Sequence, residues 1–214
     1  MAGTDEHQLF ADVFSPADQS EMAGLHCGDS PWSRAAAEWI KGSDVCDSIE
    51  KHQTRVWVFR NALDDIVGFG SLAATRWKRW PPPDGPRSRL LYIPQLGIDS
   101  RFHGKPDDPE WRFSNQIMDH LIHEARELAL EIHDTKPASK HVDLLFLKVH
   151  KDNIAAKKVY ERFEFERLPA FEENSLYVMS RKLDLNENDL SGNDWSGKHD
   201  TRFYNQDFCS RWIG

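Results

Sequence analysis

Two stretches of the sequence combine residue types in a spacing that could do chemistry, and the first, residues 98–121, bears on phosphate binding. It begins as a strand ending at Ile98 and continues into a turn with Gly104 and Lys105. A loop of this kind that runs into a helix presents unpaired N–H groups, which favour anions. The segment Pro106–Trp111 (PDDPEW) then adds two prolines, two aspartates and a glutamate, which would repel a polyphosphate. The stretch is therefore either a phosphate loop with an insertion or an acidic loop that only caps a helix.

The second stretch is LKVHKDNIAAKKVYERFEF, residues 147–165. A buried strand ends at Val149, a polar turn follows, and Asn153 is at or near the N-cap of a helix that carries Tyr160 two turns along. One side of this helix forms an apolar stripe of Ala155, Val159 and Phe163. The residues alone allow two interpretations, a structural helix with Asn153 as its cap, or a helix that also brings the Tyr160 hydroxyl to a reacting group.

The elements around these stretches predict a mixed α/β sheet. Strands are expected from apolar, β-branched and aromatic runs at 55–60, 66–73, 90–98, 142–149, 165–168 and 176–182. Helices are expected from Ser15–Pro16 onward and at 33–41, 113–133 and 153–163, the last two as crossover connections. Pro94 cannot donate a ladder hydrogen bond, so we expect a bulge or splay within 90–98.

The domain organisation follows from a shift in composition. Residues 1–183 are predicted to form a single domain, and residues 184–214 a polar C-terminal extension rich in Asp, Asn, Ser and Gly. The extension also carries several aromatic residues, so it is expected to be partly disordered or docked, on the domain or on a second copy of the chain.

The second stretch resembles a signature of the Gcn5-related N-acetyltransferases, the GNAT superfamily, which is usually written V-x3-N-x2-A-x3-Y-x3-G-F. Glu164 replaces the glycine, and the matching residues are Val149, Asn153, Ala156, Tyr160 and Phe165. The order of elements from about residue 10 to 182 is also similar to that family. The resemblance implies a GNAT-like fold in which acyl-coenzyme A lies between two splayed central strands, here 90–98 and 142–149. The implied activity moves an acetyl group from acetyl-CoA to a primary amine.

The same resemblance assigns the cofactor-binding residues. Backbone groups of Leu96, Gly97 and Ile98 would pair with the pantetheine arm in the manner of an added strand. The pyrophosphate would lie on the following loop and helix N-terminus, at His103, Gly104, Lys105, Arg112, Ser114 and Asn115. Arg112 and Ser114 stand where the family's loop carries small residues, chiefly glycine, and Pro106–Trp111 is an insertion. A hydrogen bond from Asn153 would orient the cofactor or the edge of the cleft.

The implied chemistry is direct attack of an amine on a thioester. Tyr160 matches the family's frequent general acid, with its hydroxyl near the sulfur, and a backbone N–H near Leu96–Ile98 would polarise the carbonyl. The attacking amine must be neutral, which requires a base or a water chain. No single base stands out, and the candidates on or after the two strands are Tyr92, Gln95, Asp99 and His150.

Composition sets limits on other functions. The net charge of -8 and the scattered basic residues argue against nucleic acid as a general partner. The sequence has neither an apolar run of membrane-spanning length nor a signal-like N-terminus, so a cytoplasmic protein with no membrane partner is expected. His120 and His123 lack companion ligands, so no metal is expected. The loop 76–89 contains Trp77 and Trp80 and is either a solvated hairpin loop or a contact for an acidic or aromatic acceptor.

Two functional hypotheses follow. The first is an acetyl-CoA-dependent N-acetyltransferase whose acceptor is a small-molecule or peptide amine. The second is a catalytically degenerate acetyltransferase fold that acts as a CoA-binding or regulatory module, and the altered loop and the C-terminal extension favour it. A homodimer is compatible with both.

Overall fold

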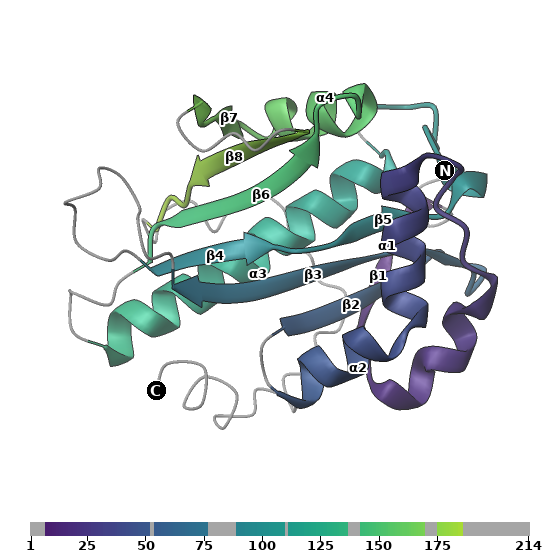
Figure 1. Cartoon of the computed structure of the whole chain (residues 1–214), viewed down its shortest axis with the longest axis horizontal. Helices are drawn as coiled ribbons and strands as arrows, with labels where there is room; N and C mark the ends of the chain where they lie inside the picture. The colour runs from purple at the N-terminus through teal and green to yellow at the C-terminus, as the bar shows by residue number, and fades with distance from the viewer. Residues whose placement is uncertain are drawn as a thin grey trace, which may run out of the picture.

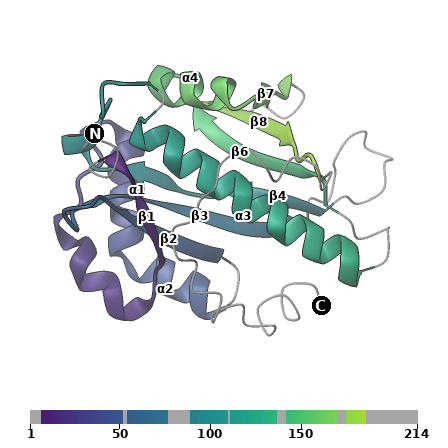
Figure 2. The ribbon, with the colours of Figure 1, turned by 180° about the vertical axis from the view of Figure 1, so that it is seen from behind.

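The structure, a computed structural model, describes residues 7–51, 54–76, 89–109, 111–136, 142–169 and 175–185. A mixed sheet lies at the centre, with α1 and α2 on one face and α3 on the other (Figures 1 and 2). The elements in chain order are β1 (Phe10–Val13), a 3₁₀ helix (Pro16–Gly24), α1 (Pro31–Lys41), α2 (Ser43–Glu50), β2 (Thr54–Arg60), β3 (Ile66–Arg76), β4 (Arg89–Ile93), β5 (Leu96–Ile98), a 3₁₀ helix (Ser100–Phe102), α3 (Phe113–Thr135), β6 (Leu144–His150), α4 (Ile154–Arg162), β7 (Glu166–Arg167) and β8 (Leu176–Lys182).

The strands of the sheet follow the order β1-β2-β3-β4-β6-β8-β7, with β5 paired to β3 beside this path. β4 and β6 are parallel, and α3 makes the crossover between them. α4 connects β6 to β7, which run in the same direction on either side of β8. The predicted mixed α/β sheet with two crossover helices is thereby confirmed.

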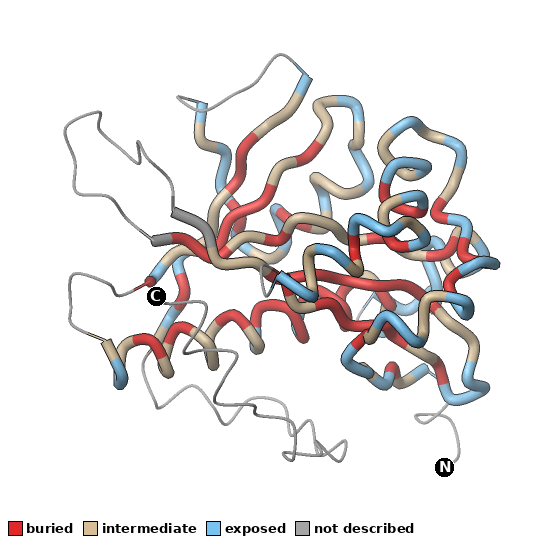
Figure 3. The backbone as a smooth tube through the Cα atoms, turned by 60° about the horizontal axis from the view of Figure 1, so that its bottom comes forward, coloured by how far each residue is buried: buried red, intermediate tan, exposed pale blue. Residues whose placement is uncertain are grey.

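Two apolar clusters hold the layers together. The larger one packs α3 and α4 against the sheet and includes Ile117, Leu121, Leu145 and Leu147, all buried. The smaller one lies under α1 and α2 and includes Ile40 and Phe69. Figure 3 shows the buried residues running along the central strands and the inner side of α3. Burial of such side chains stabilises a fold by about 25 cal/mol per Å² of apolar surface.

Most predicted elements are present, and the differences have local causes. The predicted first helix, with Ser15 before it, is a 3₁₀ helix that buries only Met22. β1 and α2 were not predicted. β1 is a short, largely exposed edge strand that is held by its ladder to β2, and α2 has eight residues with one buried, Val45. The loop residues 77–88 and the extension residues 186–214 lie outside the described residues, so the interpretations of both stay predictions.

The expected break at Pro94 divides the predicted strand 90–98 into β4 and β5. Ala73 of β3 pairs with Tyr92 before the break, and Gly70 pairs with Leu96 after it. The segment from Tyr92 to Leu96 therefore advances by four residues while β3 advances by three, from Ala73 to Gly70. The β4–β5 segment thus contains one extra residue, as in a β-bulge. The extra residue reverses the alternation of side chains, and Ile93 and Leu96 both pack toward the α3 cluster.

Candidate functional site

The central strands part beyond the break. The β4–β6 ladder ends where Ile93 pairs with Leu147, while β6 continues beside β8 as far as His150. β5 stays with β3, and the ribbons of β5 and β6 diverge in Figure 1. We call the region between Leu96–Ile98 and Lys148–His150 the fork. It lies between the predicted strands 90–98 and 142–149, where the resemblance to the GNAT family implied the cofactor cleft.

The edge of β5 that faces the fork is set by its ladder with β3. Asp99 N–H donates to Val67 O, and Ser71 N–H donates to Gln95 O. Because bonded and non-bonded pairs alternate in an antiparallel ladder, Gly97 also bonds to β3, whereas Leu96 and Ile98 turn their N–H and C=O groups to the fork. Two of the three predicted backbone contacts therefore face the fork, and Gly97 does not.

Packing, rather than a contact with the fork, explains why a glycine stands at position 97. A Cβ at this position would lie 2.5 Å from Phe69 Cε1 and 2.8 Å from Cys27 Sγ. The absence of a side chain lets the segment before α1 pack directly on β5. This contact is one of those that hold α1 over this arm of the fork.

His103 lies at the end of the same edge. Its Nε2 is 3.0 Å from the carbonyl oxygen of Ile98, which as an acceptor requires the ring to donate. Gly104 follows with a positive φ of 71° and is exposed, as is Lys105. The three residues predicted for the first half of the phosphate loop therefore lie directly beyond the fork-facing edge.

The insertion is closed at its base by a single backbone bond. Phe113 N–H, at the start of α3, donates to Lys105 O at 3.0 Å. This bond places the two predicted halves of the phosphate loop side by side and leaves residues 106–112 as a loop between them. The interpretation of Pro106–Trp111 as an insertion into a phosphate loop is compatible with this geometry.

The N-terminus of α3 keeps donors without acceptors. Asn115 N–H and Gln116 N–H both donate to Arg112 O, and no side chain caps the helix. Among the described residues, Ser114 N–H has no acceptor, and Arg112 Nε is buried without one. Unpaired donors at a helix N-terminus favour an anion, so Arg112 and Ser114 fit the role predicted for them.

Asn115 lies in the first turn of α3, as predicted, and makes two further side-chain contacts. Its side-chain amide donates to Pro109 O at 2.6 Å, and its carbonyl oxygen accepts from Arg162 Nη1 at 2.8 Å. The side chain thus ties α3 to the insertion and to α4, and one of the two N–H groups of its amide is used in this way. Its predicted contact with a phosphate stays a prediction.

Gln116 makes a similar set of contacts that the sequence did not predict. Its amide donates to His7 O and Trp111 O, and its carbonyl oxygen accepts Leu9 N–H at 3.0 Å. The N-terminal segment and the insertion therefore share one anchor in the first turn of α3. The only signal in the sequence was an amide side chain at an otherwise apolar helix position.

Both ends of α4 are capped by residues of the predicted motif. Asn153 Oδ1 accepts Ala156 N–H at 3.2 Å, as an N-cap does. At the other end Phe165 N–H donates to Tyr160 O and Glu164 N–H donates to Glu161 O, the two bonds of a Schellman motif. Glu164 has a φ of 61°, the left-handed conformation that glycine adopts most readily. The motif spacing is thus the spacing of two helix caps, with Tyr160 fixed between them.

Tyr160 is 9% exposed, and its ring lies 6.1 Å from that of Phe165. Burial raises the pKa of this phenol to about 12, and the nearby Tyr92 adds to the rise. The hydroxyl is therefore protonated at neutral pH and available as a donor. Tyr92 comes from β4 and stacks on Phe146 of β6, with ring centroids 4.6 Å apart.

The carboxylate of Asp99, a candidate base, accepts hydrogen bonds from Arg101 and His26. Arg101 donates to it through Nε at 3.0 Å and through its backbone N–H, and His26 N–H also donates. Burial raises the pKa of Asp99, but these hydrogen bonds and the charge of Arg101 outweigh it and lower the pKa overall. A stable carboxylate with satisfied oxygens is a poor proton acceptor, so Asp99 serves to hold the end of β5.

His150 is also unsuited to be a base in this arrangement. Its Nδ1 accepts Asp152 N–H at 3.2 Å, so in the neutral ring the proton is on Nε2. Its ring stacks on Trp32 of α1, with centroids 4.6 Å apart and an interplanar angle of 20°. The sequence did not single out Trp32, because only the fold brings the first turn of α1 to the end of β6.

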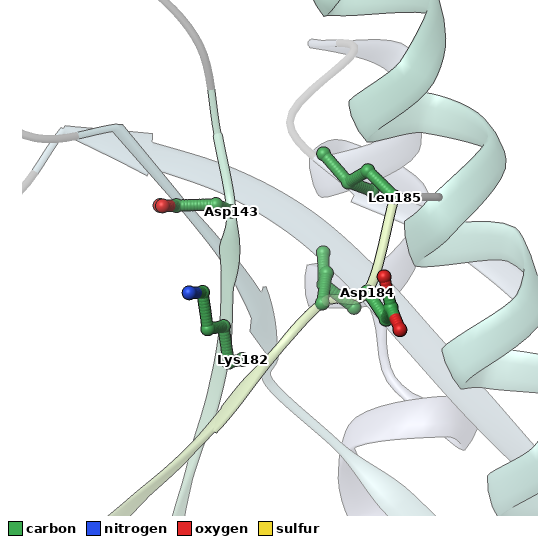
Figure 4. Close-up of a pocket in the computed structure, with 5 residues that line it drawn as sticks. Asp143, Lys182, Asp184 and Leu185 are labelled. Atoms are coloured by element: carbon green, nitrogen blue, oxygen red, sulfur yellow. The ribbon is translucent and has the colours of Figure 1, made fainter. Parts of the chain in front are cut away.

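A hollow of about 470 Å³ lies elsewhere, lined by Asp143, Lys182, Leu183, Asp184 and Leu185 (Figure 4). These residues are at the end of the β6–β8 ladder opposite His150. The hollow is therefore separate from the fork and from Tyr160, and its chemistry does not bear on the predicted site.

Within the described residues there is neither a metal-binding group of side chains nor a membrane-spanning helix. No group of three or more His, Cys, Asp or Glu side chains gathers there in a way that could hold a metal ion. None of the described helices has the length and apolar composition that crossing a membrane would require.

Comparisons with known proteins place this geometry in context. No protein-family model and no curated protein sequence matches the chain. Among solved structures, AtaTR bound with acetyl-CoA is 14% identical with a TM-score of 0.60, over 82% of this chain and 94% of that one. NAA60 of Arabidopsis thaliana, in complex with a bisubstrate analogue, is 16% identical with a TM-score of 0.55, over 84% and 100%. A GNAT-family acetyltransferase of Staphylococcus aureus is 14% identical with a TM-score of 0.53, over 83% and 100%. Similarity at this level of identity establishes the fold.

Proposed function

We propose that this chain, which has the fold of the Gcn5-related N-acetyltransferases, transfers an acetyl group from acetyl-CoA to a primary amine. The observation that carries the proposal is that three segments share the larger apolar cluster. They are β5, with its fork-facing edge, the start of α3, with its unpaired donors, and α4, with Tyr160. Each suits a different part of a thioester cosubstrate.

The described residues fit such a cosubstrate along its length. Both backbone groups of Leu96 and the N–H of Ile98 offer an edge with which the amide groups of a pantetheine arm can pair, while Ile98 O is bonded to His103. Ser114 N–H and the Arg112 guanidinium suit a pyrophosphate, with His103, Gly104 and Lys105 beside them. Gly97, Asn115 and Asn153 act in this proposal through packing and capping.

The reaction is a direct displacement. The amine nitrogen bonds to the thioester carbonyl carbon, the carbon–sulfur bond breaks, and the departing sulfur takes a proton. The acylated nitrogen then loses its extra proton through water, which restores the proton of the donor. Tyr160, the tyrosine of the motif, is the residue we assign to donate toward that sulfur, and its phenol is protonated at neutral pH. The ammonium form of the acceptor loses its proton to water, since neither Asp99 nor His150 is arranged to accept it.

The acceptor is proposed to enter from the α1 face. α3 and α4 cover the opposite face, whereas Trp32 and His150 meet at the mouth of the fork. The similar structures differ in their partners: NAA60 holds a bisubstrate analogue, and AtaT has been captured with acetyl-methionyl-tRNA. For this chain, with its net charge of -8, we favour a small-molecule or peptide amine.

One experiment distinguishes the proposed acetyltransferase from the alternative, a degenerate fold that binds CoA or a partner without turnover. Acetyl-CoA at micromolar concentration should raise the melting temperature, as mass action requires, and a panel of primary amines should then release free thiol. Binding without thiol release from any amine would favour the degenerate alternative. No thermal shift at millimolar acetyl-CoA would exclude the proposed function.

A further inference from the structure

Ser71 of β3 lies directly opposite the break that separates β4 from β5. It is 0% exposed, and its hydroxyl donates to Gln95 O at 2.8 Å while accepting Gln95 N–H at 3.0 Å. Ser71 N–H also donates to Gln95 O. Both backbone groups of Gln95 are therefore bonded to this one serine.

Gln95 lies where the ladder with β3 becomes irregular. The extra residue at the break shifts the chain relative to β3, and Pro94 has no N–H to contribute. The register of β5 places Gln95 opposite Ser71, but Gln95 N–H is bonded to the Ser71 hydroxyl, whereas a regular bonded pair would use the Ser71 carbonyl. The Ser71 hydroxyl supplies the acceptor, and its own proton returns to Gln95 O.

The consequence concerns the direction of the chain after the break. The first residue beyond Pro94 is attached to β3 at two points, so β5 must follow β3. β6 meanwhile keeps its course beside β8. The two strands separate because the bulged chain is held on the β3 side.

We propose that Ser71 is a positioning residue that keeps the fork open for acetyl-CoA. This rests on the proposed function, since the fork is the proposed cofactor site. The serine touches neither the fork-facing edge of Leu96 and Ile98 nor Tyr160, and it acts through Gln95. Without the hydroxyl, Gln95 N–H loses the acceptor that it has in this structure, and the segment Pro94–Leu96 loses two of the hydrogen bonds that hold it beside β3.

The test compares Ser71→Ala with Ser71→Thr and a matched control. The control is Ser48→Ala, which also removes a hydroxyl bond, the 2.7 Å contact between Ser48 of α2 and Thr54, away from β5. The dissociation constant for acetyl-CoA is measured by calorimetry, with the melting temperature and the hydrogen-exchange rate of the Gln95 amide. Ser71→Ala should bind acetyl-CoA about tenfold more weakly and expose Gln95 to exchange. Ser71→Thr and Ser48→Ala should bind as the unmodified chain does.

Two results would overturn the role of Ser71. One is equal acetyl-CoA affinity in Ser71→Ala and Ser48→Ala, and the other is a Gln95 amide that stays protected in Ser71→Ala. Should Ser71→Ala not fold, weak acetyl-CoA binding by Ser71→Thr with a protected Gln95 amide would count against the proposal equally. A chain that binds no acetyl-CoA in its unmodified form contradicts the proposed function instead, while the exchange of Gln95 still reports on Ser71.

Discussion

The two helices that border the fork begin in opposite ways. α4 is capped at its N-terminus, because the side-chain oxygen of Asn153 accepts the Ala156 N–H of the same helix. α3 has no side-chain cap, and its first turn keeps Ser114 N–H without an acceptor among the described residues. A capped helix can hold a side chain such as Tyr160 in place, whereas an uncapped one can bind an anion. We therefore expect α4 to position Tyr160 and α3 to bind an anion.

The largest expected effect tests α4. Tyr160→Phe removes the donor but keeps the ring that packs near Phe165, so the fold and the cofactor site should survive. We expect kcat to fall by about 10²-fold, within the range for one general acid, with the acetyl-CoA dissociation constant unchanged. Thiol-release kinetics and calorimetry measure the two quantities. An unchanged kcat would remove Tyr160 from the mechanism.

The next effect tests α3. Arg112→Ala removes the guanidinium, whose buried Nε lacks an acceptor among the described residues, and we expect acetyl-CoA to bind about tenfold more weakly, near 1.4 kcal/mol. Acetyl-pantetheine, which has no pyrophosphate, serves as the matched ligand and should lose nothing. Equal losses for both ligands would mean that Arg112 supports the loop rather than the phosphates.

The sequence predicted α4 and its N-terminal cap more completely than it predicted the contacts of the α3 loop, and the reason is physical. Asn153, Tyr160, Glu164 and Phe165 are determined by helix caps, whose partners lie within five residues along the chain. Pro94 likewise predicted the break, because a missing N–H is a local property. Local rules of this kind can be read from one stretch of sequence.

The missed features depend on partners far away in the chain. Ser71 meets Gln95, Trp32 meets His150, and Gln116 meets His7 only after the sheet has formed. Asn115 illustrates the limit: its place at the start of α3 was predicted, but Arg162 and Pro109 decide where its amide points. Element order was therefore predictable, and the use of individual polar side chains was not.

A third prediction separates capping from cofactor contact at Asn153. Asn153→Ala should cost about 1 kcal/mol of unfolding free energy through loss of the cap. Asn153→Asp keeps the accepting oxygen but loses the amide donor, so it should restore stability, measured by denaturant titration. If Asn153 acts only as a cap, the KM for acetyl-CoA in Asn153→Asp stays at its original value. A raised KM in this stable variant would show that the amide also contacts the cofactor.

The smallest effect concerns the other end of α4. Glu164 holds a left-handed conformation that costs a non-glycine residue about 1–2 kcal/mol, while glycine loses about 0.5–1 kcal/mol of chain entropy on folding. Glu164→Gly should therefore stabilise the chain by about 0.5–1 kcal/mol, since the ion pair it gives up, with Arg181 at 3.9 Å, joins a largely exposed carboxylate. Denaturant unfolding measures the gain, and Glu161→Gly, in the helix itself, is the control that should lose stability. Because the Schellman bonds fix Tyr160 through its own carbonyl, kcat should not fall in Glu164→Gly. A loss of stability there would mean that the Arg181 contact outweighs the strained backbone.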